Sequence, residues 1–462
     1  MRDLSWLVRN RGVLALTVAC LVPVVLWFDA APLSVRFQDA GTTLTSISVL
    51  FGLVGIVAFS MNLVLGARLK FVEKLFGGLD RMYFVHRTNG RVTYLLLLTH
   101  LVLMLLGRAT TSIDSALDLL TPAAGLTVIL GLIALVLMTV SIAMTLYVRL
   151  NHEMFIYVQR SFGVVFILGA LHAFRTPGTK ALSRPLTFYL IGIVILGLGA
   201  WLYRSFLGEV LVRRLDYRVI SVNKLDQSVT EIVMGPDEQQ LSFIPGQFVF
   251  LEFQSDAIRR VFHPFSVEPA GQSALISFRS GAVSKQAHPF SITSAPHERE
   301  LRVSVKSLGD FTRALRRLEP GALVRVEGPY GRFCSSLIPN RKQVWVAGGI
   351  GVTPFLSMAR ALDDPELEVD FFYGMERGDE GYFLEELYEI ADRHKRLKVI
   401  PVKRDKLGFI TSEDIAAVAR PLKDKDILIC GPPPMIDGLN RQFLDQGLSS
   451  RQIHFEKFGF VG

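Results

Sequence analysis

The sequence predicts a multidomain membrane protein, in which a six-helix transmembrane bundle precedes an antiparallel β-barrel domain and an α/β domain with a parallel sheet. Half of the 462 residues are hydrophobic, and the mean hydropathy of +0.37 is too high for an ordinary soluble protein. Apolar runs crowd residues 12–206, whereas the remaining residues have a mixed, globular composition. We therefore expect three domains, at 1–210, 211–336 and 337–462.

Six apolar stretches are long enough to cross a bilayer, whose hydrocarbon core is about 30 Å thick. The first stretch follows basic residues but has no small-residue cleavage site, so we expect a retained helix rather than a signal peptide. Lys and Arg gather before the first span, in the 67–81 loop and after the last span, which places both termini in the cytoplasm. The basic 175–185 loop breaks this rule. The expected spans are 12–29, 45–66, 84–106, 124–147, 157–174 and 186–206.

Charge and cysteine content exclude several classes of protein. The formal net charge of +8 comes without a basic patch interleaved with aromatic residues, so we expect no nucleic-acid partner. Cys20, Cys334 and Cys430 lie far apart in the sequence. No metal-ligand spacing is present, so disulfides and iron–sulfur clusters are not expected.

Histidines in the third and fifth spans are the first candidates for a functional site. Ionisable residues inside a membrane are costly and usually functional. His86 and His100 are 14 residues apart, which places them on nearly the same side of a helix and about 21 Å apart along its axis. Counting from the same side of the membrane, His172 lies level with His100, and imidazole is a common axial ligand of haem iron. The alternative is buried histidines that are hydrogen-bonded to neighbouring helices.

The inner level lacks an obvious partner for His86. Gln159 lies at the matching depth of the fifth span, and glutamine is a poor haem ligand. His152 lies two turns, or about 10 Å, lower on the same helix.

Short alternating strands after residue 211 predict a small closed barrel that carries a flavin. The expected strands are 217–220, 229–234, 248–253 and 301–305. In the segment from His288 to Pro296, an aromatic ring beside small hydroxyls can lie along a flavin ring while a hydroxyl binds its edge. Lys306 and the backbone donors from Gly309 to Thr312 can hold a pyrophosphate. Each segment alone is more typical of an ordinary barrel turn, but their order favours a flavin site.

The last 120 or so residues alternate strands and helices, as in a parallel sheet covered on both faces. A buried strand at 343–347 ends in Gly348-Gly-Ile-Gly-Val-Thr-Pro354, where glycines allow a dinucleotide to approach a helix N-terminus. A second strand at 426–429 ends in Cys430-Gly-Pro-Pro-Pro-Met435. The terminal Phe458-Gly-Phe460 can close over a flavin or serve as a plain hydrophobic anchor.

Together, these motifs resemble the flavin and nicotinamide domains of the ferredoxin–NADP reductase type. With six spans and paired histidines ahead of them, the chain resembles the ferric reductase and NADPH oxidase superfamily in its bacterial form. The resemblance implies that cytosolic NADPH or NADH gives a hydride to FAD, and that single electrons then pass through one or two b-type haems to an acceptor at the outer face. It also implies a location in the bacterial inner (plasma) membrane. The motifs are HPFSITSAP, VKSLGDFT, GPYG, GGIGVTP, CGPPPM and FGF.

The resemblance assigns roles to individual residues. Phe290 and Ser291 flank and hydrogen-bond the isoalloxazine, and Phe460 shields the flavin face that nicotinamide must reach. The implied catalytic residues are Phe290, Ser291, Cys430 and Phe460. The other implied flavin ligands are His288, Pro289, Thr293, Lys306, Gly309 and Thr312, and the implied nucleotide ligands are Gly348, Gly349, Gly351, Thr353, Pro354, Cys430, Gly431 and Pro432.

Two departures from the family pattern stand out. Gln159-Arg160 occupies the position where the family usually has a histidine followed by arginine. Three outcomes are open: one haem only, an inner haem on His86 with a weak or absent sixth ligand, or a shifted helix that recruits His152. We favour an altered inner site. A second copy of the flavin motif start, His263-Pro-Phe-Ser266, lies in an apparent insertion that we expect to form an extra hairpin.

Four functions follow from this organisation. Oxygen reduction to superoxide is the first choice, and reduction of ferric or cupric chelates is next. Electron delivery to a quinone or a periplasmic partner comes third. A transporter or channel with a nucleotide-sensing domain would leave His100 and His172 unexplained. Arg377, just past the strand expected at 369–373, either receives a 2′-phosphate, which would favour NADPH over NADH, or is a plain surface arginine.

Overall fold

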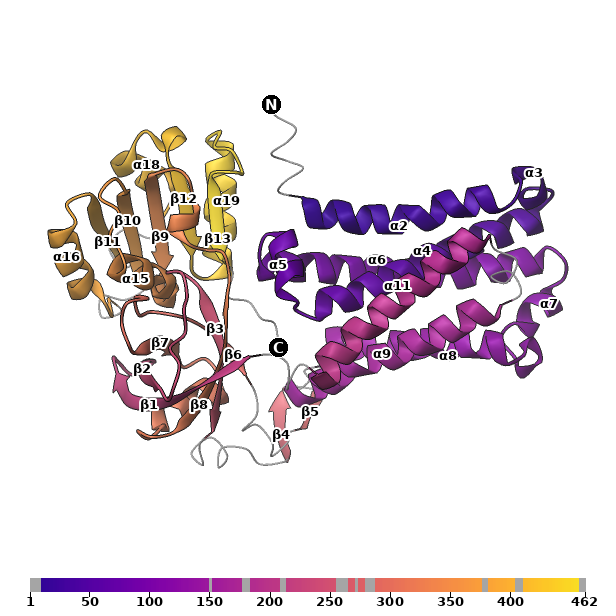
Figure 1. Ribbon diagram of the computed structural model, residues 1–462, viewed down its shortest axis with the longest axis horizontal. Helices are drawn as coiled ribbons and strands as arrows, with labels where there is room; N and C mark the ends of the chain where they lie inside the picture. Colours follow the sequence, from indigo (N-terminus) through magenta and orange to yellow (C-terminus); the bar gives the residue numbers. More distant parts are fainter. Residues whose placement is uncertain are drawn as a thin grey trace. The chain divides into compact units, whose positions relative to one another are not determined.

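A computed structural model describes residues 10–148, 152–176, 183–207, 213–254, 265–270, 273–278, 287–375, 381–403 and 410–456. The chain divides into two compact units, Met1–Val212 and Arg213–Gly462. The first unit is helical, and the second contains the sheets (Figure 1).

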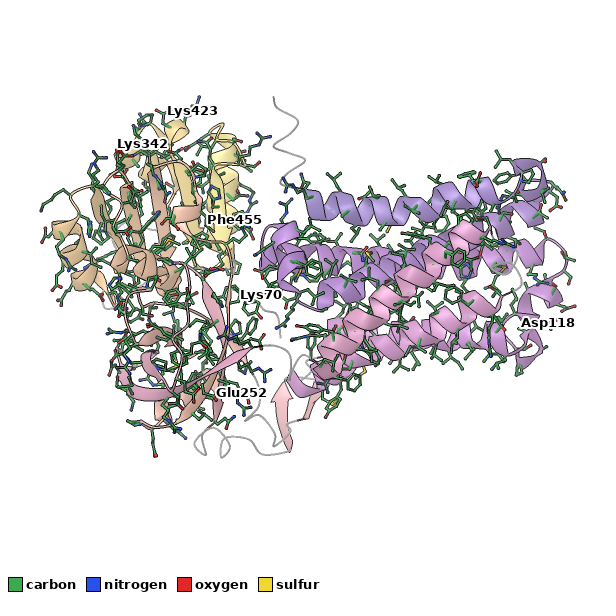
Figure 2. The ribbon with its side chains drawn as sticks, in the orientation of Figure 1. Lys70, Asp118, Glu252, Lys342, Lys423 and Phe455 are labelled. Carbon is green, nitrogen blue, oxygen red and sulfur yellow. The ribbon has the colours of Figure 1, made fainter. Side chains whose placement is uncertain are left out.

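Six helices of the first unit are long and apolar enough to cross a membrane, which confirms the six-helix prediction for the part of the chain that is described. Short helices connect them, and Lys70 of α5 and Asp118 of α7 lie at opposite ends of the bundle (Figure 2). The long helices are α2 (Arg11–Ala30), α4 (Ala40–Gly66), α6 (Leu79–Ala109), α8 (Leu126–Tyr147), α9 (His152–Arg175) and α11 (Arg184–Leu202); the short ones are α3 (Leu33–Arg36), α5 (Lys70–Phe76) and α7 (Ile113–Asp118).

Helix α4 lies at the centre of the bundle. Its Phe59 ring meets the Phe166 ring of α9 edge to face, with 5.1 Å between centroids. Its Ser60 hydroxyl donates to the Ile193 carbonyl of α11 at 2.6 Å, and its Ala58 carbonyl accepts from Asn89 of α6 at 2.8 Å. In a membrane bundle, such bonds between helices satisfy polar groups that lipid cannot.

Six strands of the second unit form the predicted antiparallel barrel. The sheet order is β6-β3-β8-β1-β2-β7, and a bridge between Ile292 and Val303 joins its two edges. Both bridging residues are fully buried in the barrel core. The strands are β1 (Arg214–Lys224), β2 (Val229–Pro236), β3 (Phe248–Gln254), β6 (His288–Ser291), β7 (Leu301–Lys306) and β8 (Leu323–Tyr330).

The predicted insertion contains a separate hairpin of β4 (Phe265–Ala270) and β5 (Ser273–Phe278), which pair antiparallel. Phe265 and Ser266 of the early flavin-like motif are therefore strand residues in this hairpin. His263 and Pro264 lie outside the described residues.

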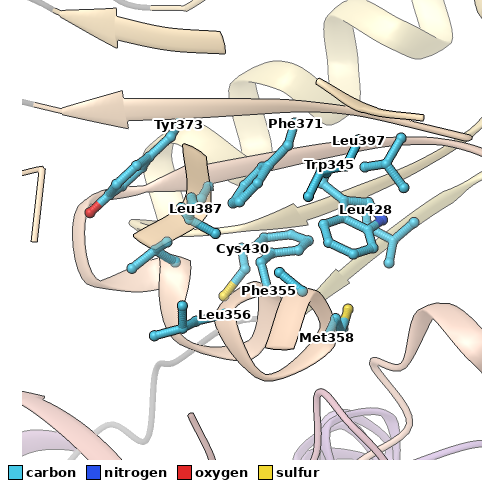
Figure 3. Close-up of a cluster of buried hydrophobic side chains, with 14 of the residues drawn as sticks. Trp345, Phe355, Leu356, Met358, Phe371, Tyr373, Leu387, Leu397, Leu428 and Cys430 are labelled. Atoms are coloured by element: carbon cyan, nitrogen blue, oxygen red, sulfur yellow. The ribbon is translucent and has the colours of Figure 1, made fainter. Parts of the chain in front are cut away.

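The remaining strands form a parallel sheet in the order β11-β10-β9-β12-β13. Alternate residues of β9 face opposite layers: Trp345 packs with α15 and α16, whereas Val344 packs with α18 and α19. Figure 3 shows the cluster around Trp345 and Phe355. The elements are β9 (Lys342–Gly348), β10 (Glu368–Met375), β11 (Leu397–Lys403), β12 (Asp426–Cys430), β13 (Ile453–Glu456), α15 (Thr353–Arg360), α16 (Leu384–Arg393), α18 (Ser412–Ala419) and α19 (Pro433–Asp445).

Arg360 ties the barrel to the α/β layer. Its guanidinium donates to the Thr293 carbonyl at 3.0 Å and makes two bonds of 2.6 and 2.9 Å to Glu386. Burial alone would lower the pKa of Arg360, but the hydrogen bonds and charge of Glu386 outweigh burial and raise it. Helix α15 is thus held against the end of β6, which fixes how the barrel meets the parallel sheet.

Arg360→Met is expected to reduce stability by about 2–3 kcal/mol, because it leaves the Thr293 carbonyl and Glu386 without their charged partner. In thermal unfolding of the full chain, followed by release of flavin fluorescence, the midpoint should fall by roughly 4–10 °C. Arg341→Met is the control, since its ion pair with Asp364 at 3.2 Å is largely exposed and should contribute at most about 1 kcal/mol. Equal midpoints for the two variants would contradict the role given to Arg360.

Candidate functional site

His100 of α6 and His172 of α9 face each other inside the bundle. Their ring centroids are 6.2 Å apart, and the ring planes are inclined by 67°. Each Nδ1 is hydrogen-bonded to a backbone carbonyl of a neighbouring helix, His100 to Ser48 of α4 and His172 to Thr127 of α8, both at 2.8 Å. A hydrogen bond from Nδ1 leaves the lone pair on Nε2, the arrangement of most metal-binding histidines.

A glycine on the facing helix makes each of these contacts possible. Side chains on a helix point toward its N-terminus, so the side chain at i+4 lies over the carbonyl of residue i. The glycine four residues after Ser48 is Gly52, and the one four residues after Thr127 is Gly131. A Cβ at Gly52 would lie 3.0 Å from His100 Nδ1, and a Cβ at Gly131 would lie 2.7 Å from His172 Nδ1. We call this pair, a carbonyl at i and a glycine at i+4, a carbonyl–glycine cradle.

The same cradle holds His86. Its Nδ1 is 3.1 Å from the Asn62 carbonyl of α4, and a Cβ at Gly66 would lie 3.6 Å from its Cε1, so this cradle is looser and would also admit a small side chain. Among the described residues, none is hydrogen-bonded to Nε2 of His86, His100 or His172. All three imidazoles are therefore oriented by backbone and keep one nitrogen available.

The outer pair fits a haem iron. Metal–imidazole bonds are about 2 Å long, so two imidazoles on opposite sides of one metal have ring centroids roughly 6 Å apart. The centroids of His100 and His172 are separated by 6.2 Å. This spacing fits a site in which His100 and His172 would hold one haem iron between them.

The inner level offers one imidazole among the described side chains. Helix α9 is continuous from its first residue, so His152 lies about 30 Å from the level of His172, whereas His86 lies about 21 Å from the level of His100. Gln159, 13 residues before His172, lies at about 20 Å, close to the level of His86. The side chain of His152 is outside the described part of the chain.

The end of β6 presents two buried hydroxyls. Ser291 is 7% exposed and Thr293 is fully buried, and neither hydroxyl oxygen has a hydrogen-bond partner among the described residues. Ile292, between them, points into the barrel core. Because buried polar atoms are normally satisfied, two orphaned hydroxyls on one side of a strand fit a ligand with a polar edge, as a flavin has.

The other predicted flavin residues surround this strand end. The His288 ring stacks on Phe311, with 3.7 Å between centroids, and the half-buried Phe290 ring meets Phe253 at 6.4 Å. Pro289 pairs with β3 in the sheet.

The short helix α14 (Asp310–Ala314) follows β7, which ends at Lys306, and the Thr312 hydroxyl accepts from the Gly309 amide at 3.0 Å. That hydroxyl also accepts from the Leu308 amide at 2.9 Å, so the hydroxyl and the Gly309 amide are both used to close the turn rather than to bind a phosphate.

The predicted nucleotide turns meet at the carboxyl ends of β9 and β12. These strands are neighbours, and the strand order reverses between them, which is where open α/β sheets bind ligands. A Cβ at Gly351 would lie 2.3 Å from the Cys430 carbonyl, and one at Gly431 would lie 3.1 Å from the Gly348 amide nitrogen. The two turns therefore approach so closely that only glycine fits.

The other residues predicted to bind nucleotide lie in the same two turns. Gly349 has φ of +52°, which favours glycine. Thr353 and Pro354 begin α15, and Pro432 precedes α19. The Cys430 side chain is fully buried in the cluster that contains Phe355, so its thiol lies in the core (Figure 3). Lys342 and Lys423 mark the opposite, amino-terminal end of the strands (Figure 2).

Phe460 and Arg377 lie outside the described residues. The cradle residues on α4 and α8 were not predicted from the sequence. A signal for two of the three cradles is present in the sequence, because Ser48 and Asn62 are 14 residues apart, as are Gly52 and Gly66, and this matches the spacing of His86 and His100.

The helical unit, the barrel and the parallel sheet have the order of a ferric reductase-like transmembrane domain followed by FAD-binding and NAD-binding domains. Three family models match successive parts of the chain: "Ferric reductase like transmembrane component" at residues 51–170, "FAD-binding domain" at 268–333 and "Oxidoreductase NAD-binding domain" at 345–441. The chain thus has the domain composition of a ferric reductase/NADPH oxidase-like fusion. The FAD-binding match includes His288–Ser291 and begins after the early motif copy.

Curated relatives resemble about half of the chain or less. The flavohemoprotein of Oceanobacillus iheyensis is 26% identical over 264 residues, which cover 53% of this chain and 59% of the relative. Sulfhydrogenase 2 subunit gamma of Pyrococcus furiosus is 24% identical over 54% of this chain and 83% of that subunit. The chain spans 59% and 45% of the first two flavohemoproteins that it matches, from O. iheyensis and Dictyostelium discoideum.

Solved structures are similar at lower identity. The FAD/NAD-binding domain of nitric oxide dioxygenase from Vibrio cholerae is 20% identical, with a TM-score of 0.42 over 53% of this chain and 98% of that one. A flavohemoglobin from Malassezia yamatoensis is 18% identical, with a TM-score of 0.46 over 91% of this chain and 99% of that one.

Proposed function

We propose that this oxidoreductase carries electrons from cytosolic NAD(P)H to an acceptor on the outer face of the bacterial inner membrane, with oxygen as the first acceptor, giving superoxide. FAD, when bound, turns a hydride into single electrons, and b-type haem carries those electrons through the bilayer. The single observation that carries the proposal is the His100–His172 pair, with its 6.2 Å centroid separation and two carbonyl-anchored Nδ1 atoms.

The residues of the second unit have separate tasks in this proposal. Ser291 and Thr293 hydrogen-bond the polar edge of the flavin, and Phe290 flanks its ring. Lys306, with the backbone at Thr312, holds the flavin phosphates. The glycine turns at the ends of β9 and β12 bind the nicotinamide nucleotide, and Phe460 covers the flavin until the nicotinamide arrives.

The two imidazoles at the outer level bear on the acceptor. If His100 and His172 hold the outer haem iron from both sides, an acceptor at the outer face would have to be reduced without a bond to that iron. Oxygen, which gives superoxide by taking up one electron, suits this arrangement. Ferric and cupric chelates suit it equally on chemical grounds, and a quinone or a periplasmic protein is a third recipient.

The test uses the full chain, purified with FAD and haem. On addition of NADPH, a superoxide-sensitive reporter should be reduced, and superoxide dismutase should abolish most of the signal. A signal that the dismutase does not affect, together with fast ferric-chelate reduction, would reject oxygen as the acceptor while leaving the electron route in place.

A further inference from the structure

Helices α4 and α6 contain the carbonyl–glycine cradle twice, and the two copies are separated by the same number of residues on both helices. His86 and His100 are 14 residues apart on α6, and their cradles, Asn62 with Gly66 and Ser48 with Gly52, are 14 residues apart on α4. The two helices run antiparallel, so one repeat supplies an oriented imidazole at two depths about 21 Å apart. Helices α4 and α6 therefore supply an imidazole and its cradle at both the outer and the inner level.

Helices α8 and α9 carry the cradle once. Thr127 and Gly131 hold His172 at the outer level. Fourteen residues further along α8, where the carbonyl and glycine would recur, the chain has Ser141 and Thr145. Both the imidazole and the glycine of a second cradle are therefore absent from these positions.

The inner parts of α8 and α9 are instead packed in another way. The Thr145 hydroxyl donates to the Ile142 carbonyl at 2.8 Å, so its β-branched side chain occupies the surface that a glycine would leave open. Ser141 and Ser161 join the two helices through their hydroxyls at 3.2 Å. Gly163, one turn after Gln159, lies under the Trp201 indole of α11.

The Trp201 indole adds a second obstacle to an imidazole at this level. Its Nε1 donates to the Arg160 carbonyl at 3.0 Å. The one inner glycine of α9 near Gln159 is thus used to admit an indole from a neighbouring helix. At the inner level of α8 and α9, the histidine is replaced by Gln159, the cradle glycine is replaced by Thr145, and Trp201 packs against the same turn of α9. None of these three features favours a second histidine ligand there.

We propose, on the basis of the proposed function, that the two haem sites are unequal. The outer haem is held by His100 and His172, whereas the inner haem is held by His86 alone. The inner iron is therefore open on the α9 side to a small neutral diatomic ligand. His86 keeps its Nδ1 contact to the Asn62 carbonyl and its approach to Gly66. Because this imidazole is oriented like the outer ones, we infer an inner haem rather than a chain with one haem.

The first test counts haems and probes the open position with carbon monoxide. The full chain, produced with ample haem and purified in detergent, should contain two haems, and carbon monoxide should shift the spectrum of half of the dithionite-reduced haem. His86→Ala should leave one haem per chain, with the low-spin spectrum of the outer site and no response to carbon monoxide.

The second test rebuilds the missing half-site. Gln159→His combined with Thr145→Gly restores the two residue types that α9 and α8 lack at this level. Haem content should stay the same, while the carbon monoxide response falls at least 10-fold and the inner haem becomes low-spin. Thr145→Gly alone is the matched control and should keep the full response.

Three results would overturn the unequal-site proposal: one haem per chain in the unaltered protein, two haems that both resist carbon monoxide, or an unchanged carbon monoxide response after His86→Ala. Failure of the proposed function has a different signature. A chain without haem, or one that keeps its low-spin haem after both His100 and His172 are replaced, would reject the electron route itself.

Discussion

Replacement of both His100 and His172 by alanine is expected to remove the outer haem and to stop electron transfer to the outer face. Within the described residues, the two side chains are the only imidazoles in contact with each other, and both are oriented by backbone carbonyls. Without them, the described residues of the outer level supply no imidazole for iron. Flavin reduction by NADPH should persist, because the flavin and nucleotide residues belong to a different unit of the chain.

The measurement is the low-spin Soret absorbance per chain, together with the rate of acceptor reduction. Both should fall to background in the double variant, while the FAD content stays unchanged. His297→Ala is the matched control, since His297 is an exposed barrel residue and its loss should affect neither quantity. Retention of the full low-spin band in the double variant would show that other residues bind the haem.

Gly131→Ala is expected to weaken haem binding at the outer site by about 10- to 100-fold, the usual effect of disturbing a residue that orients a metal ligand. The new Cβ would lie 2.7 Å from His172 Nδ1 and 2.9 Å from its Cε1. The imidazole must then move away from the Thr127 carbonyl, and its Nε2 turns with it.

The control for this substitution is Gly192→Ala on α11, where a Cβ meets nothing within 4 Å. Because alanine favours a helix over glycine by about 1 kcal/mol, this variant should retain haem at least as well as the unaltered chain. Haem loss on dilution into apomyoglobin, a haem acceptor, measures the difference. Equal loss rates for the two variants would mean that Gly131 does not position His172.

Much of the fold could be predicted from the sequence, because length and composition alone identify a membrane span. The six expected spans correspond to the six long helices, although α6 extends beyond the expected 84–106 at both ends. The face of the parallel sheet on which a side chain lies can also be predicted, because successive residues of a strand point to opposite faces. Cys430 therefore lies in one layer and Ile429 in the other. A closed barrel was predicted, but the pair that closes it, Ile292 and Val303, was not, since strand pairing at the two edges depends on tertiary contacts.

The candidate site was predictable where residue type carries the chemistry. Imidazoles in membrane helices point to haem, and glycine turns after strands point to a dinucleotide. The cradles were not predicted, because a backbone carbonyl has no residue-type signature and a glycine in a membrane helix has many uses. The use of the Thr312 hydroxyl in its own turn likewise depends on local geometry that composition does not reveal.

Anaerobic addition of NADPH to the FAD- and haem-loaded chain tests the central claim most directly. The account predicts that the flavin absorbance bleaches and that the reduced-haem bands then appear without any other reductant. A flavin that bleaches while the haem stays oxidised, and becomes reduced only when dithionite is added, would contradict an electron route from the nucleotide domain to His100 and His172.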